Sequence, residues 1–430
     1  MTSADQSAKP GLRILFITQW FEPEPVFKGV RFARALTDAG HTVRVVTGFP
    51  NYPGGAVYPS YRISWRKREI IDGVEVDRLA LWPSHDRSPF GRSVNYLSFF
   101  LSVLVYCFQH MKRFDVVYVY HPPLTPALAA AIAGKFSGTP FVLDVQDLWP
   151  DSVASSGMAS GPIVRILNRL CLFVYHRATM IIGQSRGIVA LLAERGVPSK
   201  KLRLIYNWSN YQPLQSAEGL PLSLNIPPSI STSFEGNFNI VYGGNLGQAQ
   251  ALECLIAGAA EARCADSHVR LHLFGTGVAM EDLAAYARQT AGAVILHGNV
   301  SRDLMDRVFE RADALALHLK DDPLYRHTIP SKLQHYLSIG QPIIAGIAGE
   351  GRALLAQSGA ATVFDPMDAA AARDAMIAVS KLSNEAKQTM KKASKTFYIE
   401  NLSFENAMSE TLDVLKTAAE FYEHTIKRQS

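Results

Sequence analysis

Residues Tyr325–Gly351, YRHTIPSKLQHYLSIGQPIIAGIAGEG, predict a short helix that begins near Pro330 and is followed by an apolar strand at 342–345. Proline suits a helix start because its missing N–H would be unpaired there in any case. Ser331 and Lys332 fall in the first turn, where free backbone N–H groups form an anion site. A lysine there opposes the helix dipole, so we infer a bound phosphate as its reason. The alternative is an ordinary lysine facing solvent.

Outward from this stretch, apolar strand-like runs alternate with helix-like segments in both directions. The first half predicts strands at 12–18, 41–48, 73–81, 114–120, 140–145, 178–183 and 201–206, and helices at 30–39, 93–111, 127–137, 162–176 and 186–195. The second half predicts strands at 238–242, 268–274, 293–297, 313–318, 342–345 and 361–364, and helices at 249–261, 279–290, 301–311 and 351–358. This alternation is typical of parallel sheets covered on both faces. The predicted fold class is α/β, with two doubly wound parallel-sheet domains.

Length and composition agree with two domains. A chain of 430 residues exceeds one ordinary core. We expect a first domain at 11–207, a Pro- and Ser-containing linker at 208–237, a second domain at 238–402, and a terminal helix at 403–428 that packs back on the first. Hydrophobic residues make up 48% and charged residues 19%, as in a folded globular protein. The net charge of +5 is too mild to indicate nucleic-acid binding.

Cysteine usage and the N-terminus indicate a reducing compartment. The four cysteines are scattered without a CxxC pair, so we expect buried, reduced thiols rather than disulfides or metal ligands. The stretch MTSADQSAKPG has no apolar core, so no signal peptide is expected and the cytoplasm is the predicted location. Asp321 and Asp322 form the nearest approach to a metal motif, and hydrated surface charge is the better interpretation.

The stretch 93–111, SVNYLSFFLSVLVYCFQHM, lacks every Asp, Glu, Lys and Arg. Its length would fit a membrane span, but strands of one domain flank it, so a simple crossing is excluded. We expect one side to face the sheet and the other to face lipid, with basic flanks on an anionic surface; the alternative is a buried core helix. The residues assigned to membrane or acceptor contact are Tyr96, Phe99, Phe100, Leu104, Arg66, Lys67, Arg68 and Arg92.

Ligands of open α/β sheets bind beyond the carboxyl ends of the strands. At these ends the first half places acid/base residue types, and the second half places glycines and amides suited to phosphate and nucleotide. The candidates are Glu24, Gly29, His121 and Asp147 in the first half, and Gly244, Asn245, Gly275, Gly277, Gly298 and Asn299 in the second. For Gly29 a plain tight turn is the alternative, and for Glu24 a solvated loop charge.

The order of several motifs resembles a known family. The motifs are ITQWFEPE, GHTVRVVTGFPNYPGG, VQDLWPDS, YGGNLGQAQAL, LFGTG, IPSKLQHYLSIGQPIIA and GEG. Together they resemble retaining family 4 glycosyltransferases of the GT-B fold, near the branch of N-acetyl-L-fucosamine and colanic-acid transferases. The resemblance implies two Rossmann-like domains facing a central cleft. The C-terminal domain would hold a nucleotide sugar and the N-terminal domain an acceptor.

The resemblance also implies roles for individual residues. His121 would contact the transferred sugar, Asp147 would orient or deprotonate the acceptor hydroxyl, and Lys332 would neutralise the leaving diphosphate. Glu24 would position the acceptor. The remaining donor contacts would be His327, Ser331, Glu350 and Gly351, where Glu350 could instead favour the start of its own helix. A backbone-bonded structural histidine and a loop cap are the alternatives for His121 and Asp147.

The chain departs from the family pattern at three places. His327 and His335 stand where most members carry two glutamates eight positions apart, so the carboxylate role does not transfer. Gln248 and Gln250 stand where a basic residue usually follows the glycine loop, which shifts weight onto Lys332.

These observations predict a retaining hexosyl-type glycosyltransferase. The expected donor is a UDP-sugar, such as one resembling UDP-N-acetyl-fucosamine, and the expected acceptor is a polyprenyl-diphosphate-linked sugar in O-antigen, capsule or exopolysaccharide synthesis. We expect no metal or other cofactor, no nucleic-acid partner, and peripheral or monotopic attachment to the inner face of the cell membrane. The alternatives are a nucleotide-sugar 2-epimerase of the same fold and an inactive membrane-associated partner in polysaccharide assembly.

Overall fold

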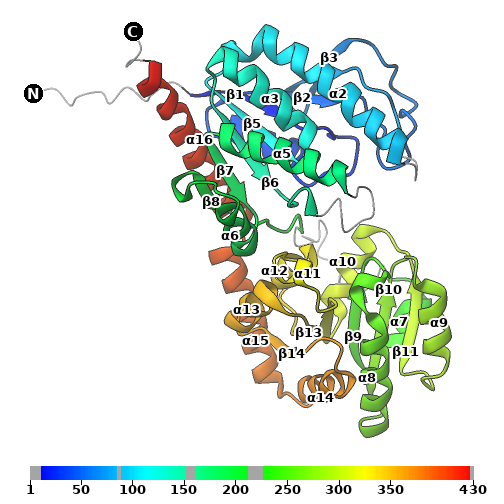
Figure 1. Ribbon diagram of the computed structural model, residues 1–430. Coiled ribbons are helices and arrows are strands. Elements are labelled where there is room, and N and C mark those ends of the chain that lie inside the picture. The colour runs from blue at the N-terminus through cyan, green and yellow to red at the C-terminus, as the bar shows by residue number, and fades with distance from the viewer. Residues whose placement is uncertain (1–10, 85–88, 152–160, 212–225, 427–430) are drawn as a thin grey trace, which may run out of the picture. The chain divides into compact units, whose positions relative to one another are not determined.

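The computed structural model describes residues 11–84, 89–151, 161–211 and 226–426 (Figure 1). The chain divides into two compact units. The first contains the residues up to Ile205 together with the terminal segment from Met408, and the second runs from Tyr206 to Ala407.

The first unit is built on an eight-stranded sheet of order β3-β4-β2-β1-β5-β6-β7-β8. Its strands are β1 (Arg13–Ile17), β2 (Thr42–Gly48), β3 (Arg66–Ile71), β4 (Val74–Leu79), β5 (Val116–His121), β6 (Phe141–Val145), β7 (Met180–Gly183) and β8 (Leu202–Leu204). Every pairing is parallel except that of β3 with β4. The central strands are buried on both faces, which explains why each is a continuous apolar run.

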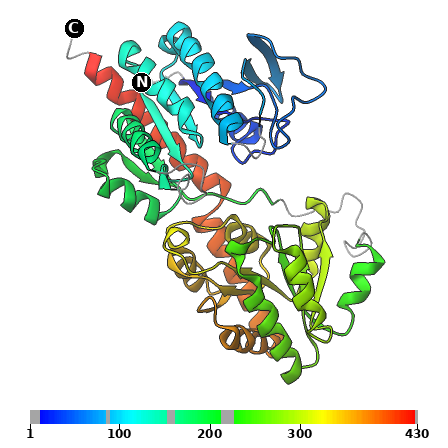
Figure 2. The same ribbon diagram turned by 45° about the vertical axis from the view of Figure 1, so that its right-hand side comes forward.

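Helices cover both faces of this sheet. They are α1 (Val30–Asp38), α2 (Pro89–His110), α3 (Leu124–Ser137), α5 (Pro162–Arg177), α6 (Arg186–Glu194) and the terminal α16 (Phe404–Ile426), which passes from the second unit into the first. Helices α2, α3 and α5 bury Phe99, Ala130 and Val174 against one face of the sheet, in one cluster with Leu15 and Val119. Figures 1 and 2 show α2, α3 and α5 side by side, in cyan to green.

The second unit is a six-stranded, wholly parallel sheet of order β11-β10-β9-β12-β13-β14. Its strands are β9 (Phe238–Gly243), β10 (Val269–Phe274), β11 (Val294–Gly298), β12 (Ala314–His318), β13 (Ile343–Gly346) and β14 (Ala361–Phe364). Its helices are α7 (Pro228–Phe234), α8 (Leu252–Ala265), α9 (Met280–Arg288), α10 (Arg302–Arg311), α11 (Pro323–Arg326), α12 (Ser331–Ile339), α13 (Gly349–Gln357), α14 (Ala369–Ser380) and α15 (Asn384–Asn401). Both units are parallel-sheet α/β folds, as predicted.

Two segments differ from the sequence-based expectation. Residues 66–71 form the antiparallel edge strand β3, although no strand was predicted there. The first four of these residues are charged, so no alternation of apolar and polar residues marks the strand. Within the expected linker 208–237, α7 buries Ile230 and Phe234 in the core of the second unit, so this part is not a linker. Residues 212–225 of that range lie outside the described residues.

One helix in the described part of the chain, Phe90–Arg113, is long and apolar enough to cross a membrane by length and composition. The strands on either side of it, β4 and β5, belong to the same sheet. A crossing would place these two strands on opposite sides of a bilayer, so the exclusion of a simple span is confirmed. The cysteines are all free as predicted, but Cys264 is exposed rather than buried.

Candidate active site

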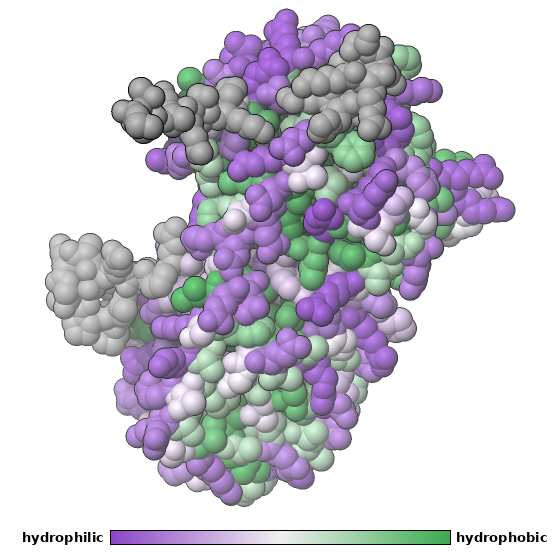
Figure 3. Space-filling view, turned by 90° about the vertical axis from the view of Figure 1, so that its left-hand side faces the viewer, coloured by the Kyte–Doolittle hydropathy of each residue, from purple (hydrophilic) through white to green (hydrophobic). Residues whose placement is uncertain are grey.

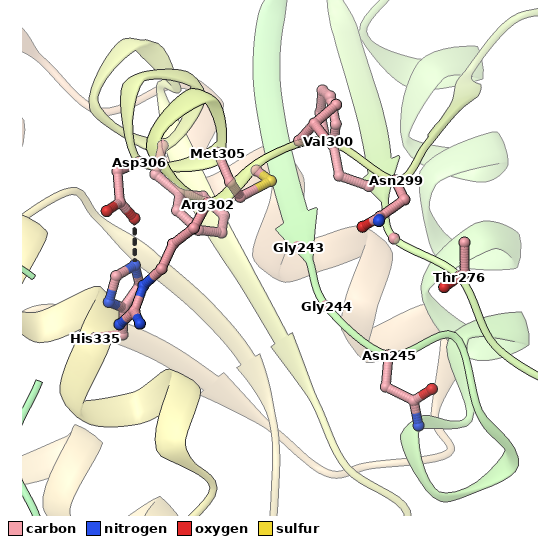
Figure 4. Close-up of a pocket in the computed structure, with 13 residues that line it drawn as sticks. Gly243, Gly244, Asn245, Thr276, Asn299, Val300, Arg302, Met305, Asp306 and His335 are labelled. Carbon is pink, nitrogen blue, oxygen red and sulfur yellow. Dashed lines mark ion pairs between the residues drawn. The ribbon is translucent and has the colours of Figure 1, made fainter. Parts of the chain in front are cut away.

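A cavity of about 470 Å³ lies at the carboxyl ends of β9, β10 and β11 in the second unit (Figure 4). Its lining residues are Gly243, Gly244, Asn245, Phe274, Gly275, Thr276, Asn299, Val300, Arg302, Met305, Asp306, Phe309 and His335. Four of the predicted donor-site residues, Gly244, Asn245, Gly275 and Asn299, are among them. Parallel strands bring these loops together at one edge because their carboxyl ends coincide.

The floor of the cavity can be formed only by glycine. Gly244 and Gly275 have φ values of +136° and +130°, which side chains other than glycine rarely adopt. A Cβ at Gly275 would lie 1.8 Å from the carbonyl oxygen of Gly244. The two loops therefore approach each other at backbone distance, so peptide groups rather than side chains form this side of the cavity.

Lys332, in the first turn of α12, lies beside this glycine floor. A Cβ added to Gly244 would be 2.8 Å from its Nζ atom. Nζ donates a hydrogen bond to the hydroxyl of Tyr242 and lies 3.8 Å from the centre of that ring. Burial lowers the pKa of Lys332 to about 7. Among the described residues, no carboxylate contacts this half-buried ammonium. An anion bound at Gly243–Gly244 would compensate for the hydration that the ammonium loses on burial.

The opposite wall comes from α10 and α12. His335 Nε2 lies 2.9 Å from an oxygen of Asp306, and the ring also lies 3.1 Å from the hydroxyl of Ser209 (Figure 4). Arg302 projects from α10 into the same cavity. Arg302 and Asp306 were not predicted as site residues, although α10 directly follows β11 and its first turns lie at the edge that carries the other loops.

The other predicted donor contacts do not line the cavity. Gly277 packs within the loop, because a Cβ there would be 2.2 Å from the carbonyl oxygen of Leu246, and Gly298 accepts a hydrogen bond from the backbone of Gly275. Glu350, in the first turn of α13, accepts a hydrogen bond of 2.8 Å from Tyr206. Four more lie outside the lining: His327, Ser331, Lys332 and Gly351.

Gln250 supports the loop after β9, near the place where the resemblance implied a basic residue. Gln250 accepts hydrogen bonds from the backbone of Gly247 at 3.1 Å and from Asn245 at 3.3 Å. The glutamine thus supports the loop and contributes no charge to the cavity.

In the first unit, His121 ends β5 and is fully buried. Neither ring nitrogen has a hydrogen-bond partner within the described residues. The ring packs edge-on against that of Trp149, with 5.7 Å between the ring centres. Burial lowers its pKa to about 3, so the imidazole is neutral at pH 7. A neutral imidazole with an unpaired nitrogen is suited to a hydrogen bond with an uncharged hydroxyl.

Asp147 follows the next strand, β6, and its side chain is accessible to solvent. The protein atoms around it reduce its hydration and raise its pKa. Asp144, inside the strand, is buried and pairs with Lys28 and the hydroxyl of Tyr118. This agrees with a structural role for Asp144 and leaves Asp147 as the accessible carboxylate at the strand end.

Glu24 differs from its expected role. It is only 2% exposed, and its carboxylate accepts three backbone N–H bonds, from Phe21, Asn51 and Tyr52. It therefore ties two loops together and is neither a solvated charge nor an acceptor-facing group. Gly29 also differs, because a Cβ there would lie 2.0 Å from a carboxylate oxygen of Glu22. The glycine makes room for a side chain of the protein itself.

Several residues assigned to membrane contact face the protein instead. Phe99 is fully buried, and Tyr96, Phe100 and Leu104 are half-buried against the same core cluster. Phe99 was thus placed on the wrong face, because a nearly uniformly apolar helix does not reveal which side is inward.

The basic residues upstream of α2 are paired. Arg66 and Arg68 contact the fully buried Asp77 at 2.6 and 3.4 Å, and Lys67 lies 3.1 Å from Glu69. Burial alone would raise the pKa of Asp77, but hydrogen bonds from Arg66 and Tyr106 outweigh it and lower that pKa. The three basic residues therefore stabilise the β3 edge. Arg92 is half-buried in the first turns of α2.

Within the described residues, no cluster of three His, Cys, Asp or Glu side chains could hold a metal ion.

Each unit matches a family model. The glycosyl transferase 4-like domain matches residues 30–208, and the glycosyl transferases group 1 domain matches residues 237–381. With the cavity at the strand ends of the second unit, these matches define the class: the chain belongs to the family 4 glycosyltransferases of the GT-B fold. The chain is similar to a protein of Escherichia coli (strain K12) named as a colanic acid biosynthesis glycosyl transferase. The two are 25% identical over 324 residues, which are 71% of this chain and 75% of that one.

Solved structures share the fold at low sequence identity. Anabaena HepE in complex with UDP-glucose has a TM-score of 0.63 and 14% identity, covering 94% of this chain and 100% of that chain. Sucrose-phosphate synthase of Thermosynechococcus elongatus has a TM-score of 0.65 and 15% identity, covering 94% and 98%.

Proposed function

We propose that the enzyme moves a sugar from a UDP-sugar to a lipid-linked acceptor, with retention of anomeric configuration, in the synthesis of a bacterial surface polysaccharide. The bond between sugar C1 and the diphosphate oxygen breaks, and the acceptor oxygen bonds to C1 on the same face. The acceptor proton passes to the departing phosphate oxygen. The charge that develops on the diphosphate is the main quantity that the protein must stabilise.

One observation carries this proposal: Lys332 lies half-buried against the glycine floor at Gly243–Gly244. Diphosphate oxygens bound there would accept hydrogen bonds from backbone N–H groups and from the ammonium. The binding of a diphosphate would raise the pKa of Lys332 and fix its positive charge. These groups would stabilise the negative charge on the leaving diphosphate without a divalent cation. We therefore expect that removal of divalent cations with EDTA leaves turnover unchanged.

In the first unit, His121 and Asp147 are the proposed contacts of the transferred sugar and the acceptor. His121 is neutral, and its buried ring nitrogens lack a partner within the described residues, which suits a hydrogen bond to a sugar hydroxyl. Asp147 is accessible, and its carboxylate oxygens can accept a hydrogen bond from the acceptor hydroxyl and so orient it.

The choice of donor and acceptor draws on the relatives. HepE was solved with UDP and with UDP-glucose, which favours UDP as the nucleotide. The name of the Escherichia coli relative refers to colanic acid biosynthesis, which favours a surface polysaccharide as the product and a lipid-linked sugar as the acceptor.

The experiment measures UDP release from a panel of UDP-sugars, with and without a short prenyl-diphosphate sugar. We expect Lys332→Ala to lower turnover by about 100-fold or more, as the loss of one preorganised donor does at comparable sites. Lys381→Ala serves as the matched control, because Lys381 is an exposed lysine at the end of α14. Its turnover should stay within about twofold of wild type, like that of other exposed surface substitutions.

The outcomes separate the candidate functions. Sugar interconversion without an acceptor would identify a 2-epimerase, and no turnover of any nucleotide sugar would identify an inactive partner. If Lys332→Ala turns over like the wild type, Lys332 has no part in the mechanism.

A further inference from the structure

We propose that the outer surface of α2, α3 and α5 docks the first unit on an anionic lipid bilayer. This surface is defined by the outward side chains of the three helices and is called the α2–α3–α5 surface below. The inference deepens the proposed function, because it rests on the lipid-linked acceptor for its biological purpose, although the surface itself is argued from the first unit alone.

Helix α2 has three polar side chains turned inward. Ser102 donates a hydrogen bond of 2.6 Å to the carbonyl of Ala80, and Ser98 accepts one of 2.8 Å from the N–H of Trp82. Asn95 donates to the carbonyl of Trp82 at 2.7 Å. These three polar side chains are thus bonded to the segment that follows β4. Ser93 and Gln109 are exposed near the two ends of α2, and between them the exposed side chains are apolar.

All three helices carry large hydrophobic side chains that point outward. They are Phe90, Leu97, Leu101, Val105 and Phe108 on α2, Phe136 on α3, and Ile163, Ile166 and Phe173 on α5. Leu101 is 59% exposed and Phe136 is 68% exposed. The rings of Phe108 and Phe136 lie 5.8 Å apart, which joins the stripes of α2 and α3. Helix α3 packs against both α2 and α5, and the three helices lie side by side (Figures 1 and 2).

This surface is unlike ordinary exposed hydrophobic residues. On the face shown in Figure 3, hydrophobic residues are interspersed with hydrophilic ones, and such scattered residues need no explanation. A row at positions 97, 101, 105 and 108 is instead a continuous stripe at helical spacing. Contiguous apolar patches of this kind mark interaction sites.

The charge of these elements identifies the occupant. Residues 89–113, 124–137 and 162–177 contain no Asp or Glu. They contain seven basic residues: Arg92, Lys112, Arg113, Lys135, Arg165, Arg169 and Arg177. All except Arg92 are exposed. Aromatic and aliphatic side chains among cations, without anions, complement a bilayer interface that carries anionic headgroups.

Helices α2, α3 and α5 follow β4, β5 and β6, so their N-terminal ends lie at the sheet edge that carries the acceptor-side residues. Helix α3 begins at Leu124, three positions after His121, and Asp147 follows the neighbouring strand β6. A lipid-linked sugar whose anchor lies in the docked bilayer would therefore present its head near His121 and Asp147. The bilayer serves as the platform from which the acceptor is taken.

The test is co-sedimentation of the full-length protein with vesicles of phosphatidylcholine alone or mixed with phosphatidylglycerol. We expect binding to the mixed vesicles at least tenfold tighter than to the neutral ones, with loss at high salt. The double variant Leu97→Asp, Leu101→Asp should weaken binding to mixed vesicles by at least tenfold. Val278→Asp, at an 86% exposed apolar position in the second unit, is the matched control and should bind like wild type. Thermal unfolding verifies that each variant is folded.

Three results would contradict the proposed docking surface. One is a folded double variant that sediments as the wild type does. Another is a concentration-dependent dimer that the double variant abolishes while vesicle binding is absent, which would make a second copy the occupant. Wild-type protein that releases UDP from a UDP-sugar but never binds vesicles would also reject the surface and leave the proposed donor chemistry standing. Vesicle binding without any turnover would do the reverse.

Discussion

UDP binding should be coupled to protonation of Lys332. In the free protein, burial lowers the pKa of this lysine to about 7, so at pH 8 only about a tenth of the molecules carry the charge. The neighbouring Tyr242 hydroxyl stays neutral, because burial raises its pKa. A bound diphosphate favours the charged lysine and raises its pKa. Binding at pH 8 should therefore take up about 0.9 proton for each UDP.

The same linkage sets the pH dependence of affinity. The dissociation constant should rise as pH increases above 7, by about eightfold between pH 7.5 and 8.5, if the bound lysine remains protonated. The charge on UDP changes little in this range, because the second pKa of a phosphate lies near 6. Uridine, which lacks the diphosphate, is the control ligand and should bind with no such dependence.

The assay is isothermal titration calorimetry in buffers of different ionisation enthalpy, which reports the protons taken up. Lys332→Met should bind UDP more weakly, without proton uptake and without the pH dependence. A wild-type dissociation constant that stays flat from pH 7.5 to 8.5, or a proton uptake near zero at pH 8, would refute the reasoning.

The same variant should unfold at a higher temperature when UDP is absent. A lysine whose pKa is lower in the folded state than in the unfolded state disfavours folding while it is protonated in the unfolded chain. The gain from Lys332→Met should therefore be largest at and below pH 7 and should vanish as pH rises towards about 10.4, the ordinary lysine value. Differential scanning calorimetry at several pH values measures it, and a lower melting temperature for the variant at pH 7 would contradict the assignment.

Three further predictions concern single contacts. Gly275→Ala should abolish UDP binding and destabilise the second unit, whereas Gly54→Ala, where a Cβ meets no atom within 4 Å, should do neither; equal melting temperatures for the two variants would count against the close approach of the loops. Lys28→Met leaves the buried Asp144 without its cation, so the free energy of unfolding, measured with urea, should fall by about 3–5 kcal/mol. A fall of less than about 1 kcal/mol would contradict this pairing. His335→Ala should weaken UDP binding by about tenfold, the loss of one charge-assisted contact, and calorimetry that finds no change would remove the histidine from the site.

The sheet edge that holds the cavity could be predicted from local patterns. The apolar runs that became β9, β10 and β11 each end in glycine or amide residues, and a parallel sheet places such ends together. Gly244, Gly275 and Asn299 were located this way. Arg302 and Asp306 were not, because a charged residue on an amphipathic helix has the same pattern whether it faces solvent or a cavity.

The orientation of α2 could likewise not be predicted from the sequence. Its length and lack of charge were evident, but the inward direction of Asn95, Ser98 and Ser102 depends on carbonyl and N–H groups of residues 80–82. Those groups are supplied by a loop whose position is set by pairing within the sheet. The outward row of hydrophobic residues could therefore be identified only after the inward direction of the polar residues was known.

The amino-acid sequence by itself determined the alternation of strands and helices, the division into two similar halves, and the family. The first two follow from hydrophobic periodicity and turn residues, which act over a few positions, and the family follows from the order of the quoted motifs. Only the tertiary structure decided that Glu24 ties loops, that Arg66 pairs with Asp77, and that Lys332 lies against the glycines. Each of these depends on burial and on partners distant in the chain, because a charge changes its role when packing replaces water with a specific neighbour.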